Sequence, residues 1–266
     1  EDKVDALQQL LISETKEQTP SNSVINLLIK YYQDGNYDDA EKLAISNTQQ
    51  FPNHKFSWKV LGEVLNQSGR VSEGLVVCQQ TVVLDSQDAE AHNNLGATFD
   101  VLGRFDEAEA SYKKAIALKP DYAEAHYNLG LLLKELGKLE DAEASYIKAI
   151  ALKPDYAEAY NNLGVTLQEL GRLDDSEASY RKSIAYKADN AEVYNNLGNL
   201  LQELKQFDLA LGSYEKAINF NKDFDAAIAG IGEVLIKKGQ HKEGLKKLRT
   251  GNGSISFDID NGLSIQ

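Results

Sequence analysis

Glycine returns every 34 residues along most of the chain, and this period constrains the fold more than any other feature of the sequence. Each glycine of one series follows leucine or isoleucine; the series is Gly62, Gly96, Gly130, Gly164, Gly198 and Gly232. A second series in the same phase is Gly35, Gly69, Gly103, Gly137, Gly171 and Gly239, with Lys205 as its one exception. A fixed period of this length indicates stacked structural units rather than one globular core. We number the units repeats one to seven, beginning at residues 21, 55, 89, 123, 157, 191 and 225.

Each repeat contains two helical patterns, which are clearest in repeat four. Four leucines in its first half have the spacing of one helical face; they are Leu129, Leu132, Leu133 and Leu136. We expect a helix over 123–136, ended by Gly137, because glycine accepts the left-handed backbone at a helix C-terminus. A second helix is expected from about Glu140 to Leu152, before Pro154. The repeat is therefore an antiparallel helix pair.

Short loops and small residues indicate how the helices begin and pack. Aspartate with glutamate three residues later predicts a capping box; the pairs are Asp121 with Glu124, Asp155 with Glu158, and Asp189 with Glu192. Gly130 and Ala142 remove bulk where two helices cross, and we expect Tyr146 to fill the gap to the neighbouring repeat. A single pair cannot bury its apolar face, so stability comes from stacking of repeats.

The combined pattern resembles the tetratricopeptide repeat. The residues that carry the resemblance in repeat four are Leu129, Gly130, Gly137, Ala142, Tyr146, Ala149 and Pro154. The resemblance is strongest over 89–222 and looser at both ends, where repeat one has Leu28 in place of the first glycine. It implies an all-α fold, a right-handed superhelical solenoid of about seven antiparallel helix pairs over residues 21–251.

The two ends depart from the period. Residues 1–20 are expected to hold an N-terminal capping helix, a half-repeat over 3–17. Residues 252–266 alternate apolar and polar side chains around Asp260-Asn261-Gly262, which predicts a β-like tail or hairpin. This segment either docks on the last helices or begins a further domain.

Composition excludes several classes of partner. A net charge of −13 and a pI near 4.8 disfavour nucleic acid and anionic membrane surfaces. No apolar run reaches the length of a membrane-spanning helix. The one cysteine, Cys78, cannot form an internal disulfide, and with no signal peptide in view we expect a cytoplasmic location.

No residue pattern predicts catalysis, a metal or a cofactor. His92 and His126 occupy equivalent positions, where other repeats have Trp58, Tyr160 and Tyr194, so we expect neutral, largely buried packing residues. No cysteine or carboxylate stands at metal-ligand spacing from them. Cys78 is expected to be a buried, inert thiol. The sequence therefore predicts that the chain is not itself an enzyme.

The resemblance implies that first helices line an inner groove, where asparagine recurs. Asn94, Asn128, Asn162 and Asn196 are 34 residues apart and resemble the asparagine ladder in the repeats of O-linked N-acetylglucosamine transferases. Such amides can clamp the backbone of an extended peptide; alternatively, they bond to the neighbouring helix and serve packing. The other candidate groove residues are Asn93, Tyr127, Asn161, Asn195, Glu124, Glu158, Glu192, Gln168 and Gln202.

The groove charge indicates the chemistry of the partner. About half of the net charge of −13 falls on groove positions, and Lys134 is the one base among them in repeats three to six. We therefore expect a neutral or basic protein segment, and no carboxylate clamp of the kind that grips chaperone C-termini.

Two function classes stay open at this stage. The chain is either a scaffold that recruits a partner, or the substrate-recruiting arm of a larger glycosyltransferase or iron-dependent oxygenase, which the resemblance suggests. Self-association through the ends of the solenoid is a third possibility. The identity of the partner does not follow from the sequence.

Overall fold

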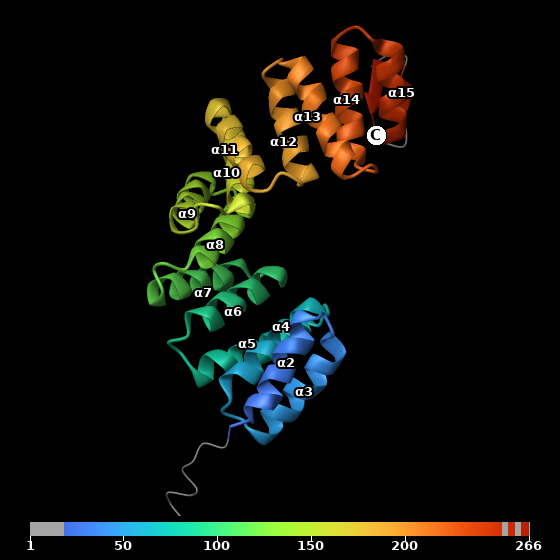
Figure 1. The fold of residues 1–266 in the computed structure, drawn as a ribbon. Coiled ribbons are helices and arrows are strands. Elements are labelled where there is room, and N and C mark those ends of the chain that lie inside the picture. Colours follow the sequence, from blue (N-terminus) through green and yellow to red (C-terminus); the bar gives the residue numbers. More distant parts are fainter. Residues whose placement is uncertain (1–18, 252–254, 259–261, 266) are drawn as a thin grey trace, which may run out of the picture. The chain divides into compact units, whose positions relative to one another are not determined.

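The computed structural model describes residues 19–251, 255–258 and 262–265. They form fourteen helices and two short strands (Figure 1). The chain divides into two units, residues 1–120 and 121–266, which we call the N-terminal and C-terminal units. The helix expected over 3–17 lies outside the described residues. None of the described helices has the length and apolar character needed to cross a bilayer.

The described part of the N-terminal unit consists of three helix pairs. They are α2 (Asn22–Gln33) with α3 (Tyr37–Gln50), α4 (Lys55–Gln67) with α5 (Val71–Leu84), and α6 (Ala89–Val101) with α7 (Phe105–Leu118). The helices α4 and α6 begin 34 residues apart. Leu28, Ala40, Ala44 and Val64 are fully buried and make the first two pairs one apolar core.

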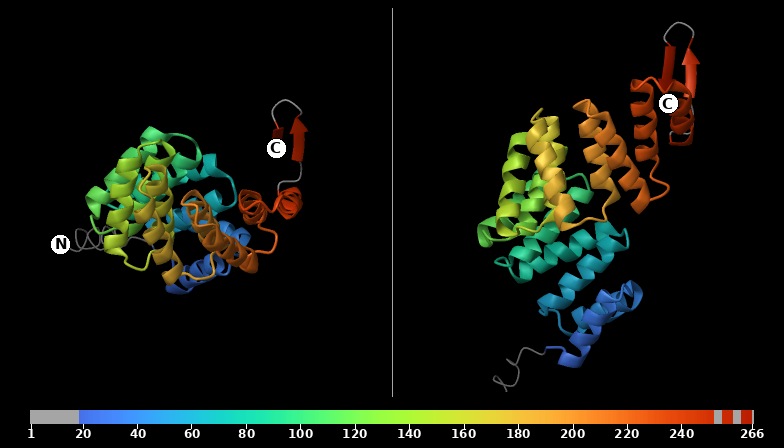
Figure 2. Two further views of the ribbon diagram at one scale, coloured as in Figure 1. Left: turned by 90° about the horizontal axis from the view of Figure 1, so that it is seen from above. Right: turned by 45° about the horizontal axis from the view of Figure 1, so that its top comes forward.

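The C-terminal unit continues the same arrangement with four pairs (Figures 1 and 2). They are α8 (Ala123–Glu135) with α9 (Leu139–Leu152), α10 (Ala157–Glu169) with α11 (Leu173–Tyr186), α12 (Ala191–Glu203) with α13 (Phe207–Phe220), and α14 (Asp225–Lys237) with α15 (His241–Gly251). The strands β1 (Ile255–Asp258) and β2 (Gly262–Ile265) follow and pair antiparallel, with Ile255 opposite Ile265.

The turn inside each pair uses a left-handed backbone, as predicted for Gly137. That residue has φ of +70° one position after the C-cap Leu136, and the other glycines of its series lie between +70° and +81°. Lys205 occupies the equivalent position with φ of +58°. A side chain with a Cβ is strained there, so repeat six pays a conformational cost that its neighbours avoid.

The predicted capping boxes are wrong. The N-caps of α8 and α10 are Tyr122 and Tyr156, which make no side-chain cap. The N-cap of α12 is Asn190, whose Oδ1 accepts a hydrogen bond from the Glu192 N–H. Asp121, Asp155 and Asp189 each stand one residue before these N-caps, too early to reach the first free N–H groups of the helix.

The tyrosines of the second helices pack on glycines of the first helices. Tyr146, Tyr180 and Tyr214 are at most 1% exposed. A Cβ placed on Gly130 would lie 2.7 Å from the Tyr146 ring, and one on Gly198 would lie 2.6 Å from the Tyr214 ring. Each ring thus packs on the glycine of its own repeat. The sequence predicted only that Tyr146 fills the gap to the neighbouring repeat.

Candidate functional site

First helices of successive repeats form a closed layer in the C-terminal unit. Helix α10 contacts both α8 and α12, and α12 contacts α14. The second helices stand further apart: a groove of about 310 Å³ opens between α9 and α11, and one of about 410 Å³ between α11 and α13. We call the side formed by α8, α10, α12 and α14 the first-helix face. Five of the candidate asparagines lie on three of these helices: Asn128 on α8, Asn161 and Asn162 on α10, and Asn195 and Asn196 on α12.

Two asparagines of the predicted ladder bond across the layer to the preceding repeat. Asn162 Nδ2 donates to the Tyr127 hydroxyl at 2.9 Å, and Asn196 Nδ2 donates to Asn161 Oδ1 at 3.2 Å. In both pairs the sixth residue of one repeat bonds to the fifth residue of the repeat before it. Asn162 and Asn196 are half-buried, whereas Asn161 and Asn195 are buried. Part of their capacity therefore serves packing.

The row of amides ends with Asn196 in repeat six and does not continue into repeat seven. The residue 34 positions after Asn196 is Gly230, which has no side chain to donate. Within the described residues, Asn195 Oδ1 is buried without a hydrogen-bond partner. The ring of Tyr214 takes the vacated space, since a Cβ on Gly230 would lie 2.5 Å from it.

A second row of polar contacts follows the same face six residues, or nearly two helical turns, further on. Lys134 forms an ion pair with Glu169 at 3.5 Å, and Gln168 Nε2 donates to Glu203 at 2.9 Å, each to the next repeat. Gln202 Nε2 donates to Glu233 at 2.9 Å. Gln168 and Gln202 also accept hydrogen bonds from the hydroxyls of Tyr180 and Tyr214 at 3.3 and 3.2 Å. The two glutamines therefore tie first helices to buried tyrosines.

Two of the three carboxylates at the start of the first helices are the most accessible of the predicted residues. Glu124 and Glu192 are exposed. Glu158 pairs with Lys187 at 3.1 Å, and a hydrogen bond from its own backbone N–H, with that lysine second, lowers the pKa of its carboxyl below the ordinary value. The Glu158 carboxyl therefore stays ionised at neutral pH.

The two candidate asparagines of the N-terminal unit differ in exposure. Asn93 is 2% exposed, and Asn94 is half-buried. The backbone carbonyl of Asn94 accepts a hydrogen bond from Thr98 Oγ1 at 2.8 Å. Asn94 therefore holds the more accessible of the two positions.

His92, His126 and Cys78 lie in partly or fully buried positions on helices. His92 and His126 are half-buried, whereas the sequence predicted that they would be largely buried. His92 Nε2 lies 3.1 Å from the Ser86 carbonyl oxygen. Cys78 is 5% exposed, and burial raises the pKa of its thiol. Within the described residues, no cluster of three or more histidine, cysteine or acidic side chains could hold a metal.

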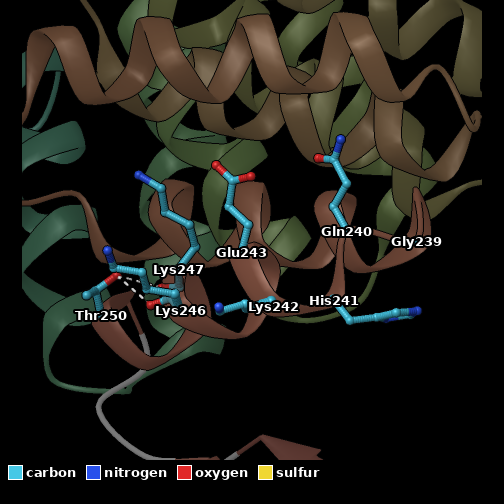
Figure 3. A pocket seen from close by; sticks show the side chains of 8 residues that line it. All are labelled: Gly239, Gln240, His241, Lys242, Glu243, Lys246, Lys247 and Thr250. Carbon is cyan, nitrogen blue, oxygen red and sulfur yellow. Dashed lines mark hydrogen bonds between the residues drawn. The ribbon is translucent and has the colours of Figure 1, made fainter.

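A cavity on α15 was not predicted from the sequence. It has about 860 Å³ and is lined by Gly239, Gln240, His241, Lys242, Glu243, Lys246, Lys247 and Thr250. Gln240, Glu243 and Lys247 point to the same side of the helix (Figure 3). The lysines recur at helical spacing, but this region lies outside the repeat positions from which the groove was inferred.

Comparison with known families identifies the repeats. Residues 102–137 and 131–171 match a family described as TPR repeat, and residues 155–223 match one described as tetratricopeptide repeat. Repeats of this type stack into helical solenoids that act as protein-binding scaffolds. Comparison with curated protein sequences found no match.

Solved structures show the same fold. The structure titled "Crystal structure of MamA" is 28% identical, with a TM-score of 0.56, and the match covers 59% of this chain and 92% of that one. One chain in the structure of the Cut9–Hcn1 hetero-tetramer of the APC/C is 17% identical with a TM-score of 0.72, and the match covers 85% of this chain and 45% of that chain. YrrB, described as a TPR protein with an unusual peptide-binding site, is 20% identical with a TM-score of 0.56, covering 70% and 95%.

Proposed function

We propose that this chain, which contains tetratricopeptide repeats, is a scaffold that binds an extended, neutral to basic protein segment along the first-helix face, rather than an enzyme. The observation that carries the proposal is the row of half-buried asparagines, one on each of α8, α10 and α12, beside the accessible carboxylates Glu124 and Glu192. A right-handed superhelix and a ladder similar to that of O-linked N-acetylglucosamine transferases belong to the same proposal.

Hydrogen-bond capacity supports binding in addition to packing. An asparagine amide has two N–H donors and a carbonyl acceptor with two lone pairs. The bond from Asn162 to Tyr127 uses one of these donors, as does the bond from Asn196 to Asn161. The other N–H and the carbonyl can therefore bond to the backbone of a peptide. Packing and clamping are compatible uses of one side chain.

Spacing supports an extended ligand. Packed helices lie about 8–10 Å apart, and an extended chain advances about 3.3 Å per residue. One asparagine would then meet about every third residue of the ligand. Because these contacts go to the backbone, they hold the segment without selecting its sequence.

The experiment uses a pool of random dodecapeptides displayed on phage and selected on the intact chain. A selected peptide, labelled with fluorescein, is titrated with wild type and with Asn128→Ala/Asn162→Ala. We expect the double variant to bind on the order of tenfold more weakly, from two lost hydrogen bonds of about 0.5–1.5 kcal/mol each. Asn219→Ala, on the exposed side of α13, is the matched control and should change nothing.

Salt dependence provides a second measurement on the same peptide. Affinity should fall between about 50 and 300 mM salt, because exposed carboxylates are screened over about 10 Å at 0.1 M. Equal affinities of wild type and the double asparagine variant would refute the proposed clamp.

The pairing of β1 with β2 favours a second candidate function. A lone two-stranded hairpin is marginal in water, so these strands suit an arrangement in which the repeats recruit substrate for a catalytic domain that follows them. Expression of the complete natural reading frame, followed by an assay for glycosyl transfer or iron-dependent oxygenation, distinguishes this arrangement from a free scaffold.

A further inference from the structure

Repeat four departs from its neighbours on the first-helix face. Its fifth residue is Tyr127, whereas the equivalent residues of repeats three, five and six are the buried asparagines Asn93, Asn161 and Asn195. Tyr127 is half-buried. The amide row therefore includes one aromatic side chain, next to Asn128 in sequence and bonded to Asn162 through its hydroxyl.

Two more tyrosines pack around Tyr127. Its ring centroid lies 4.8 Å from that of Tyr156, with the planes inclined by 36°, and 6.0 Å from that of Tyr146. Tyr156 is the N-cap of α10, and Tyr146 belongs to α9. Three elements thus build one aromatic cluster, and its half-buried members are Tyr127 and Tyr156.

Carboxylates act on both of these rings. Burial and then Glu158 raise the pKa of the Tyr127 hydroxyl, with a further contribution from Glu192. Burial raises the pKa of Tyr156, to which Tyr127, Glu124 and Glu158 also contribute. The face of an aromatic ring is itself electronegative. The cluster therefore combines ring faces and nearby negative charge, the two features that attract a cation.

Two features of the cluster indicate that it can receive a charged or hydrogen-bonding group: a cation on one ring and a buried hydroxyl without a partner among the described residues. The Lys153 ammonium lies 4.3 Å from the centroid of Tyr156, so this ring already holds a cation of the chain itself. The Tyr146 hydroxyl is buried and, within the described residues, has no hydrogen-bond partner. The equivalent hydroxyls of Tyr180 and Tyr214 bond to Gln168 and Gln202.

The missing partner of Tyr146 has a simple cause. Repeat four has Lys134 in place of the glutamine, and Lys134 pairs with Glu169 instead. Burying a hydroxyl without a hydrogen-bond partner is unfavourable, and a bound group or a water that it brings can supply the partner.

We propose that the Tyr127–Tyr156 ring pair, together with Glu124, Glu158 and Glu192, receives an arginine or lysine side chain of the bound segment, which takes the place of Lys153 on the Tyr156 ring. This inference rests on the proposed function and adds to it. The asparagines hold the backbone of any extended segment, whereas the tyrosine cluster selects a segment with a basic residue at one position. The bond from Asn162 to Tyr127 places the two devices side by side.

The test uses the dodecapeptides selected on the intact chain. We expect them to share a basic residue, and its replacement by norleucine should weaken binding to wild type on the order of tenfold, within the range of cation–π contacts that exclude water. With Tyr127→Leu/Tyr156→Leu, the basic and norleucine peptides should bind almost equally. With Tyr127→Phe/Tyr156→Phe, which keeps the ring faces, the preference should persist.

Controls separate this inference from folding and from the proposed function. Far-UV circular dichroism verifies the helices of each variant; if the double leucine variant unfolds, Tyr156→Leu alone serves, because Tyr156 is half-buried and precedes α10. Peptides that need Asn128 and Asn162 but show no preference for a basic residue would overturn the inference and leave the proposed function intact. Failure of every dodecapeptide to bind would overturn both.

Discussion

Two glycine-to-alanine substitutions in repeat six are predicted to have opposite effects on stability. Gly198 lies in α12 and Gly212 in α13, and both have helical backbone. A Cβ on Gly198 would lie 2.6 Å from the buried ring of Tyr214, whereas a Cβ on Gly212 would have nothing within 4 Å. Alanine gains about 0.5–1 kcal/mol over glycine in a helix interior. Gly212→Ala should therefore stabilise the chain by that amount.

For Gly198→Ala the same gain is outweighed by overpacking. Extra methyl groups in a packed core cost about 1–3 kcal/mol. The Tyr214 ring has no room to retreat, because a Cβ on Gly230 would lie only 2.5 Å from it on another helix. The net result should be a destabilisation of about 1–2 kcal/mol.

Urea unfolding of the intact chain, followed by circular dichroism, measures both variants. Because repeats unfold as coupled neighbours, the single tryptophan, Trp58 in repeat two, provides a fluorescence probe distant in sequence whose midpoint should move least. In a Tyr214→Leu background the cost of Gly198→Ala should shrink, since the ring is gone. If Gly198→Ala were as stable as Gly212→Ala, the described packing of tyrosine on glycine would be wrong.

Three further predictions concern single residues. Lys205→Gly should raise the free energy of unfolding by about 0.5–1 kcal/mol in thermal unfolding, because it relieves a positive φ at some cost in chain entropy, and Gly171→Lys should lower it. Cys78 should react with a disulfide reagent only as fast as the chain opens, because its thiol is buried and burial also raises the pKa of that thiol; rapid modification of the native protein would contradict its burial. The carboxyl of Glu158 should titrate below an ordinary glutamate in NMR, and Lys187→Ala should shift its midpoint upward; because this pKa is lowered on folding, its contribution to stability is present at neutral pH and is lost as pH falls through the folded-state pKa.

Much of the fold follows from the spacing of a few residue types. The glycine series marks where first helices end, and the observed backbone at Gly137 confirms the reason given for it. The capping boxes failed because a pattern of aspartate and glutamate three residues apart does not fix which residue is the N-cap. Tyr122 and Tyr156 hold that place, one residue later than expected.

The candidate site is less predictable than the fold. The period identifies Asn161 and Asn162 as members of two rows, but adjacent residues of a helix point about 100° apart, and only the position of the next helix decides which is buried. The pair from Asn196 to Asn161 depends on that position. Tyr156 was missed because it belongs to a loop, where no helical periodicity applies.

The hydrogen bonds from the sixth residue of one repeat to the fifth residue of the repeat before it also determine which whole repeats can be deleted or duplicated without loss of these bonds. Deletion of residues 157–190 would bring Asn196 opposite Tyr127, in the place that Asn162 now holds, and the phenol could accept from either amide. Duplication of the same stretch would repeat the step from Asn196 to Asn161. Interior repeats are thus interchangeable as far as these bonds are concerned, whereas the repeat that carries Gly230 supplies no amide to the repeat before it.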